Sequence, residues 1–349
     1  MDRIKRMLLI ICMFSLITIF INGCQAQSTA TKAGKNWKLL SPIGKHVYGM
    51  TTAVLDNKIH LLGGVPGKDW TDPGDFHQVY DPCTDSWSLW APIPDPCGGL
   101  GWSMSTVYDG KIYLFGGGSG PGLEGSARVW VYDPVTDEWS QLSDMPVERI
   151  NGAAVTAGDY IYIFGGHRLH NPPADELIST YKYDPSMDTY ERVANMPETA
   201  TFITRAYYNG FIYAIPGLEH EWLGGKDFYY VYGQGVLKYD VAADSWTKLN
   251  IPRIQQRTYT LTQLCSNPAD GSRLFVLGGK PPEGQRTNLA AYFDMETETF
   301  GQIDPMPKGR CCGSSAVVDG KIYVSGGFWA DVADVYDCTE TWGYPFPEK

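Results

Sequence analysis

The sequence has few positive charges and lacks the catalytic signatures that identify common enzyme classes. Lys and Arg number 28 against 39 Asp and Glu, so the net charge at pH 7 is −11. This balance argues against a nucleic-acid surface and against general affinity for anionic membranes. No nucleotide-binding glycine loop stands between a strand and a helix, and no Gly-x-Ser-x-Gly or His-Glu-x-x-His motif occurs. We therefore expect no cofactor, no metal site and no nucleic-acid partner.

A long apolar run occurs only near the N-terminus. Residues Met7 to Ile21 carry no charge and follow the basic stretch 2–6. This run is too short to span a membrane comfortably but suits the core of a signal peptide. The segment that ends in Cys24, Ile-Asn-Gly-Cys, resembles the lipobox of bacterial lipoproteins. It predicts a signal peptide over residues 1–24, with Cys24 lipidated.

We expect residues 25–35 to be a flexible linker. The predicted location is therefore the cell envelope, with membrane contact through the lipid anchor alone. Asn22 departs from the small residue usual in a lipobox. Ordinary cleavage near Ala26, which would give a secreted or periplasmic protein, and an uncleaved anchor therefore stay open.

A motif with a period of about fifty residues recurs along the chain. Its most regular part is a double glycine, which has one degraded copy. The copies are Gly63-Gly64, Gly116-Gly117, Gly165-Gly166, Pro216-Gly217, Gly278-Gly279 and Gly326-Gly327. An aromatic-Asp pair follows each copy, and a further aromatic residue stands a few positions later. The pairs are Tyr80-Asp81, Tyr132-Asp133, Tyr183-Asp184, Tyr239-Asp240, Phe293-Asp294 and Tyr336-Asp337.

Short apolar segments lie inside each repeat. Residues 111–115, 160–164 and 321–324 are rich in β-branched and aromatic side chains and are bounded by turn residues, which is typical of strands. A period in this range with short strands predicts a β-propeller. We expect the double glycine where neighbouring blades leave no room for a side chain, and the late aromatic residue between blades.

These motifs make residues 36–346 resemble the kelch-repeat family. The resemblance implies an all-β, six-bladed kelch propeller with four antiparallel strands per blade over residues 36–349. The segment 36–40 is one outer strand more than six blades need. We expect it to complete the blade of the last repeat and close the ring, which would leave 342–349 as a tail. Closure by a C-terminal strand is the alternative.

Six cysteines follow Cys24, and an exported chain can hold them in disulfides. Their spacing does not select a pairing. Cys83 and Cys338 are expected in equivalent turns of blades that meet where the ring closes, whereas Cys97 and Cys311 are expected on the other face. A vicinal disulfide between Cys311 and Cys312 is a further alternative. The six are Cys83, Cys97, Cys265, Cys311, Cys312 and Cys338.

Function in a propeller is expected at the axial mouth, where connections from every blade converge. Cations recur in the connections that lead into the inner strands: Lys45, Arg149 and Arg310 each stand third after a proline, and Arg257 stands two positions further in its repeat. Four cations around one mouth of an acidic protein predict an anionic ligand held by guanidinium forks. The alternative is that each Arg pairs with a loop carboxylate such as Glu148.

The same connections carry aromatic residues suited to stacking on sugar rings or to a protein contact. Trp102, Trp222 and Trp329 are therefore ligand-binding candidates. We expect the insertion 218–235 to lie over the mouth. Its Glu219 and Glu221 are candidates for proton transfer; otherwise the catalytic residues are unknown.

Two functions compete on these observations. The first is an exported, lipid-anchored module that binds a glycan or a protein at its mouth without catalysis. The second follows from a distant resemblance to the kelch sialic-acid mutarotases, which interconvert anomers of an anionic sugar. Such an epimerase would pair Glu219 or Glu221 with Arg149 or Arg257. The missing catalytic signatures favour the binding module.

Overall fold

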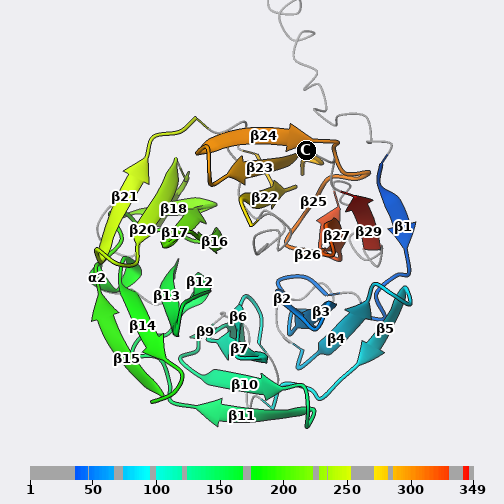
Figure 1. The fold of residues 1–349 in the computed structure, drawn as a ribbon, viewed down its shortest axis with the longest axis horizontal. Helices are drawn as coiled ribbons and strands as arrows, with labels where there is room; N and C mark the ends of the chain where they lie inside the picture. Colours follow the sequence, from blue (N-terminus) through cyan, green and yellow to red (C-terminus); the bar gives the residue numbers. More distant parts are fainter. Residues whose placement is uncertain are drawn as a thin grey trace, which may run out of the picture.

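The strands of the protein surround a central axis, and their sheets follow one another in chain order (Figure 1). We describe the fold from a computed structural model. The described residues are 36–45, 47–66, 74–94, 100–119, 124–167, 174–222, 228–233, 235–252, 271–281, 286–329 and 341–345. The predicted signal peptide, Cys24 and the predicted linker 25–35 lie outside them.

Four of the sheets are consecutive antiparallel units of four strands, each with its first strand nearest the axis. Sheet 1 holds β2 (Thr51–Leu55), β3 (Lys58–Leu62), β4 (His77–Asp81) and β5 (Ser86–Leu89). Sheet 2 holds β6 (Met104–Tyr108), β7 (Lys111–Phe115), β10 (Val129–Asp133) and β11 (Glu138–Leu142). Sheet 3 holds β12 (Ile150–Ala157), β13 (Tyr160–His167), β14 (Thr180–Asp184) and β15 (Thr189–Val193). Sheet 4 holds β16 (Thr204–Tyr208), β17 (Phe211–Ile215), β20 (Val236–Asp240) and β21 (Ser245–Leu249).

The last two sheets differ from this pattern. Sheet 5 has three described strands, β22 (Arg273–Leu277), β23 (Ala290–Asp294) and β24 (Thr299–Ile303). Sheet 6 has four, in the order β26 (Ser314–Val318), β27 (Lys321–Ser325), β29 (Thr341–Pro345) and β1 (Lys38–Leu40). The described chain therefore contains five four-stranded sheets where the repeats predict six. Residues 253–270, which precede sheet 5, lie outside the description.

The end of the chain corrects one expectation. Residues 341–345 are not part of a tail, because β29 pairs with β27 on one side and with β1 on the other. In sheets 1 to 4 the third strand ends at the Tyr-Asp pair, whereas in sheet 6 the third strand follows Tyr336-Asp337. The repeat pattern carries no information about this pairing, so it assigned residues 342–349 to a tail.

Further short elements lie outside these sheets. The hairpins β8 (Gly118–Ser119) with β9 (Glu124–Gly125) and β18 (Leu218–Trp222) with β19 (Phe228–Tyr232) stand between the second and third strands of sheets 2 and 4, and the single-turn helix α2 (Ala174–Leu177) stands there in sheet 3. β25 (Arg310–Cys311), before the inner strand of sheet 6, pairs with β28 (Phe328–Trp329), which follows β27. Within the residues described, no helix is long and apolar enough to cross a membrane.

The double glycines lie where adjacent sheets touch, as predicted. At Gly63 an added Cβ would lie 1.9 Å from the carbonyl oxygen of Leu100 in the next connection. The second glycine, Gly64, donates its amide hydrogen to the same oxygen at 2.9 Å. A side chain at this point would push neighbouring sheets apart.

Gly63→Ala is expected to destabilise the protein by about 2 kcal/mol more than Gly110→Ala. Both glycines have a left-handed backbone, with φ of 66° and 68°, so both substitutions carry the same conformational cost of roughly 1–2 kcal/mol. A Cβ at Gly110 would meet nothing within 4 Å, whereas one at Gly63 meets the Leu100 carbonyl. Urea unfolding of the two variants measures the difference. Equal losses of stability would show that the contact between sheets does not require glycine.

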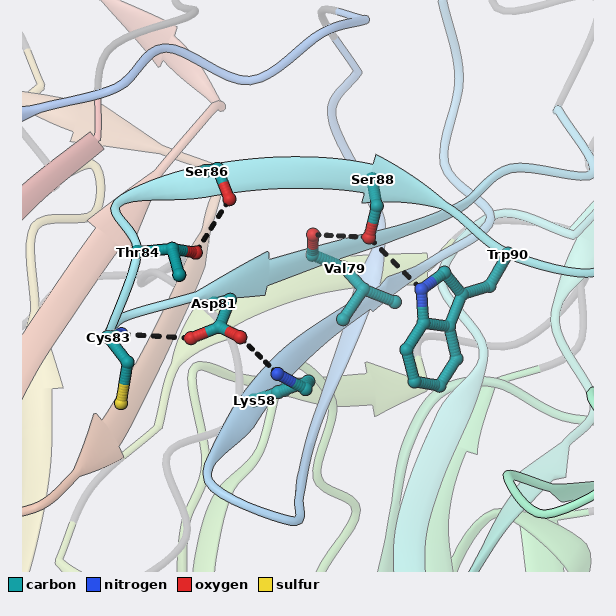
Figure 2. Close-up of polar contacts among 8 residues, drawn as sticks. All are labelled: Lys58, Val79, Asp81, Cys83, Thr84, Ser86, Ser88 and Trp90. Carbon is teal, nitrogen blue, oxygen red and sulfur yellow. Dashed lines mark hydrogen bonds and ion pairs between the residues drawn. The ribbon is translucent and has the colours of Figure 1, made fainter.

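The Tyr-Asp pair and the turn after it form one hydrogen-bonded unit. In sheet 1 the Tyr80 hydroxyl donates to Asp85 Oδ1 at 2.7 Å, and Asp85 has a left-handed φ of 49°. Figure 2 shows Asp81 accepting from the amide of Cys83, at 2.9 Å, and from the ammonium of Lys58. Such Asx-type bonds stabilise the tight turn between the third and fourth strands. The same tyrosine bond recurs in Tyr132–Asp137, Tyr183–Asp188 and Tyr239–Asp244.

These turns also join neighbouring sheets. Asp85 Oδ1 accepts from the amide of Ser41, directly after β1, and Trp87 Nε1 donates to the Ser41 carbonyl at 2.9 Å. Trp139 makes the equivalent bond to Ala91, and Trp246 to Ala194. The late aromatic residues Trp87, Trp139 and Trp246 therefore contact the preceding sheet, as predicted.

Candidate functional site at the axial mouth

Five residues with left-handed backbone conformations surround the axis where the connections lead into the inner strands. Their φ angles lie between 53° and 66°, a region that side chains larger than glycine rarely adopt. Four hydrogen bonds join them: from the second residue on, each amide nitrogen donates to the carbonyl oxygen of the residue before it in ring order, over 2.6–3.0 Å. We call this chain of hydrogen bonds the belt. Its residues, in that order, are Cys312, Gly49, Trp102, Asn151 and Phe202.

The belt also holds a second set of connections, those that lead from the second to the third strand of a sheet. The residue before each belt residue pairs with the residue that follows the double glycine or its copy. These pairs are Tyr48–Val65, Gly101–Gly118, Ile150–His167, Thr201–Leu218 and Cys311–Phe328. Both sets of connections therefore start from one hydrogen-bonded frame. The insertion 218–235, predicted to be a loop, contains the hairpin β18–β19 and begins at this frame.

Apolar side chains pack against the belt. Tyr48 and Trp102 lie edge to face with their ring centroids 5.9 Å apart. Both are buried, together with Ile150, Cys311 and Cys312. Trp102, a predicted ligand contact, is only 7% exposed. Within the described residues it therefore serves mainly to build the mouth.

Below the belt the inner strands enclose a cavity of about 370 Å³. Hydroxyl groups of adjacent inner strands bond to one another beside it: Thr52 Oγ1 to Ser314 Oγ at 2.7 Å, and Thr106 Oγ1 to Thr156 Oγ1 at 3.0 Å. The wall of the cavity is therefore largely β-strand backbone, small apolar side chains and hydroxyls. Arg205 is the charged residue among the described residues that line it.

The sequence analysis did not select Arg205, although it is the one arginine at a position where the other described inner strands have small side chains. It stands three residues after its belt residue, where the other described inner strands have Thr52, Ser105, Ala154 and Ser315. Its Nε donates to the Ala154 carbonyl at 3.1 Å and its Nη2 to the Ser105 carbonyl at 2.7 Å. One guanidinium thus links the inner strands of sheets 2, 3 and 4 beside the cavity.

Arg149, in contrast, lies inside the protein and not on the rim of the mouth. It is 2% exposed. Its guanidinium donates to the Gly165 carbonyl at 2.6 Å and to the carbonyl and hydroxyl of Ser179. Burial lowers the pKa of Arg149 to about 10, so it stays charged at neutral pH. These bonds join the start of β12 to the connection before β14, a structural role within sheet 3.

Arg310 is likewise fully buried, and its Nη1 donates to the Gly326 carbonyl at 3.3 Å. The carbonyl oxygens of Arg149 and Arg310 accept from Gly117 and Gly279, which makes the two arginines equivalent. The equivalent residue before sheet 1 is Val47, which stands two positions before its belt residue.

The predicted register of Lys45 is therefore wrong. Counting from the preceding proline placed it beside the arginines, but the first connection is two residues longer. Lys45 is exposed, and its ammonium lies 4.4 Å from the centroid of the Phe76 ring. The four predicted cations do not form one ring: two are internal, one lies elsewhere in the connection, and Arg257 lies outside the described residues.

The other predicted site residues are placed only by their strands. Glu219, Glu221 and Trp222 belong to β18, and Trp329 ends β28 opposite Arg310. No group of three or more potential metal ligands occurs within the described part of the chain.

The described cysteines are free thiols. Cys83 is exposed, whereas Cys311 and Cys312 are buried and their sulfurs lie 3.7 Å apart without a bond. The predicted alternative of a vicinal disulfide is therefore not formed in the structure. Cys97, Cys265 and Cys338 lie outside the description, so pairings that involve them stay predictions.

A buried histidine pair was also missed. His77 begins β4, and its Nε2 lies 2.9 Å from His60 Nδ1 of β3. Trp139 and Tyr132 of sheet 2 pack against His77. Burial lowers the pKa of His60 to about 3 and that of His77 to about 4, so both are neutral at physiological pH. The pair belongs to the contact between sheets 1 and 2.

Comparison with known proteins agrees with this architecture. The family model for the KLHDC2/KLHL20/DRC7 Kelch-repeats domain matches residues 105–327. Human Kelch-like protein 23 is 28% identical over 84% of this chain, and the chain spans 47% of that protein. Kelch-like protein terF of Aspergillus terreus is 26% identical over 95% of the chain and 73% of that protein.

Alpha-scruin of Limulus polyphemus is 22% identical over 78% of the chain and 30% of its own length. The chain thus spans about half, or less, of two of these three relatives. The family model covers more than half of the chain and includes the double glycines from Gly116 to Gly327. The protein belongs to the kelch-repeat family.

Proposed function

We propose that the protein is an interaction module that binds a protein partner at its axial mouth. Kelch-repeat domains generally mediate protein interactions, and two of the relatives above are named Kelch-like proteins. The observation that carries the proposal is the belt. It holds both sets of connections on one frame, whose backbone hydrogen bonds do not depend on the connections' sequences. Binding loops on a rigid frame are the usual arrangement for recognition.

A protein partner fits the mouth better than the anionic sugar that the sequence suggested. The internal bonds of Arg149 leave its guanidinium unsuited to gripping a substrate carboxylate, and Arg310 is fully buried. The frame itself is lined by Tyr48, Trp102 and Ile150. These side chains are buried, so they fix the backbone of the mouth and leave the binding contacts to the connections. The mutarotase alternative loses one of its two candidate arginines for the same reason.

Site-specific photo-crosslinking in the native cells tests this proposal. A photoreactive residue at Lys45 stands at the mouth end, because the connection into an inner strand lies there. The control is Val135, which is 90% exposed in the turn between β10 and β11, at the opposite end of the sheets. We expect Lys45 to crosslink to a discrete protein, an adduct that excess purified wild-type chain suppresses, and Val135 to give none. The same adduct at both positions, or at Val135 alone, would contradict the proposal.

We also propose that the ring has six blades and that β1 closes it. Two observations support this. Sheet 5 needs one further inner strand, and residues 253–270 provide enough chain for it. In sheet 6, Lys38 to Leu40 pair with Gly343 to Thr341, which joins the two ends of the described chain in one sheet. Joining the ends in this way removes an exposed sheet edge.

Export with a lipid anchor at Cys24 remains part of the proposal. It is supported by the apolar run 7–21 and by the lipobox-like Ile-Asn-Gly-Cys. Intact mass of the protein from the native membrane fraction tests it. We expect a mature chain that begins at an acylated Cys24, and a Cys24→Ser variant without the acyl mass. An unacylated N-terminus near Ala26 would leave plain secretion instead.

A further inference from the structure

We propose that Cys311 and Cys312 form a peroxide-reactive dithiol at the axial mouth, with Cys311 as the nucleophile and Cys312 as the resolving thiol. The proposal is independent of any protein partner. It rests on three features of the described residues: the distance between the two sulfurs, a cation in contact with one of them, and their position beside the belt.

The two thiols already interact. Cys312 donates its S–H to the sulfur of Cys311 over 3.7 Å. Neither sulfur is bonded to another cysteine. An attack of one sulfur on the other therefore needs a movement of less than 2 Å to reach the S–S bond length of about 2.05 Å.

A guanidinium selects which sulfur is the thiolate. Arg286, in the connection between β22 and β23, donates from its Nε to Cys311 Sγ at 3.1 Å. The bond from Cys312, together with the charges of Arg286 and Lys280, lowers the pKa of Cys311 to about 7, although burial opposes this. The same bond and burial raise the pKa of Cys312. Near neutral pH about half of the pairs thus hold a single proton, on Cys312, and a thiolate is the form that attacks an oxidant.

The burial of the two thiols limits the size of the oxidant that can reach them. Cys311 is 3% exposed and Cys312 is 8% exposed, so a bulky disulfide such as oxidised glutathione has poor access, whereas hydrogen peroxide is little larger than water. Cys312 is itself a belt residue, with φ of 58° and a carbonyl that accepts from Gly49. The pair is therefore next to the mouth and not in the core between sheets.

The reaction balances in two steps. The Cys311 thiolate attacks one oxygen of hydrogen peroxide, the O–O bond breaks and hydroxide leaves, which oxidises Cys311 to a sulfenic acid. Cys312 then loses its proton and attacks the sulfenic sulfur; the S–O bond breaks, the oxygen leaves as water, and the S–S bond forms. Peroxide is reduced and the two thiols are oxidised by two electrons overall.

The test treats the full chain with hydrogen peroxide at pH 7 and follows the thiols by mass spectrometry of the peptides. We expect loss of two hydrogens in the peptide that contains Cys311 and Cys312, before any oxidation of the exposed Cys83. Cys312→Ser should stop at a sulfenic acid on Cys311 that dimedone traps. Cys311→Ser should leave Cys312 unmodified. Circular dichroism confirms that each variant is folded.

Arg286→Gln provides the matched control for the role of the cation, because it keeps both thiols and removes the charge. We expect its rate of oxidation at pH 7 to fall about fivefold, since a rise of the Cys311 pKa by about one unit from 7 lowers the thiolate fraction at pH 7 from about one half to about one tenth. Two results would overturn the proposal: oxidation of Cys83 ahead of the pair in the folded wild type, or equal rates for wild type and Cys311→Ser.

Discussion

Arg149→Ala is expected to lower the free energy of unfolding by about 3 to 5 kcal/mol. A hydrogen bond that involves a charged group contributes roughly 1.5–3 kcal/mol, and the guanidinium donates to two carbonyl oxygens, of Gly165 and Ser179. Because Arg149 is 2% exposed, truncation also leaves these acceptors buried and opens a cavity. Equilibrium unfolding in urea, followed by tryptophan fluorescence, measures the loss.

Two further variants separate this role from ligand binding. Lys45→Ala removes an exposed cation from the same kind of connection and should change the stability by less than about 0.5 kcal/mol. Arg149→Lys keeps the charge but not the planar fork, so its stability should lie between those of wild type and Arg149→Ala. A loss below about 1 kcal/mol in Arg149→Ala would mean that the internal bonds are not what holds Arg149 in place.

The free energy of unfolding is expected to fall steeply as the pH is lowered from 6.5 to 4.5, before most carboxylates take up protons. His60 and His77 are held neutral in the folded state, with pKa values near 3 and 4. In the unfolded chain both have a pKa near 6.5. Their contribution is therefore complete above pH 6.5 and is lost as the pH falls toward 4, because only the unfolded state takes up protons there. Two protons give a loss of about 4 kcal/mol between pH 6.5 and 4.5.

The geometry explains why the pair resists protonation. Ala91 O can only accept, so His77 carries its proton on Nδ1, 3.2 Å from that oxygen, and its Nε2 accepts from His60 Nδ1. A second proton on His77 would set two N–H groups against each other. The charges nearest the pair oppose one another: Asp137 favours a charged His77, whereas Lys58 disfavours a charged His60.

The double variant His60→Gln/His77→Gln tests this assignment. It should be less stable than wild type at pH 7, but its stability should change little between pH 6.5 and 4.5. Urea unfolding at a series of pH values gives both curves. If wild type and double variant lose stability in parallel, the histidine pair is not the source of the acid sensitivity.

Much of the fold could be predicted because its determinants are local. The glycine at the position of Gly63 recurs because a carbonyl oxygen of the next connection leaves no room for a side chain there, as at Gly116, Gly165 and Gly278. The tyrosine at the position of Tyr80 recurs because its hydroxyl bonds to the turn after it in sheets 1 to 4. The third strand of sheet 6 could not be predicted, because β29 is selected by its pairing with β1 from the other end of the chain. The spacing of the repeats carries no information about a contact between the two ends of the chain.

The site was predicted less well for a related reason. The cations were aligned on the preceding prolines, but the structural reference is the carbonyl that accepts from the double glycine. When the connections are aligned on that carbonyl, Arg149 and Arg310 occupy the same position and Lys45 does not. Whether an equivalent arginine faces solvent or the interior depends on partners such as Ser179, thirty residues further along the chain. Arg205 could have been found by aligning the inner strands.

Hydrogen exchange of the propeller in complex with the partner crosslinked from Lys45 tests the central claim most directly. If the mouth is the binding surface, the amides that gain protection should lie in the connections before the inner strands, residues 41–50, 143–150 and 194–203. The turn around Val135 and the outer strands β5 and β11 should exchange as in the free protein. Protection confined to those turns or outer strands, with the mouth connections unchanged, would contradict the account.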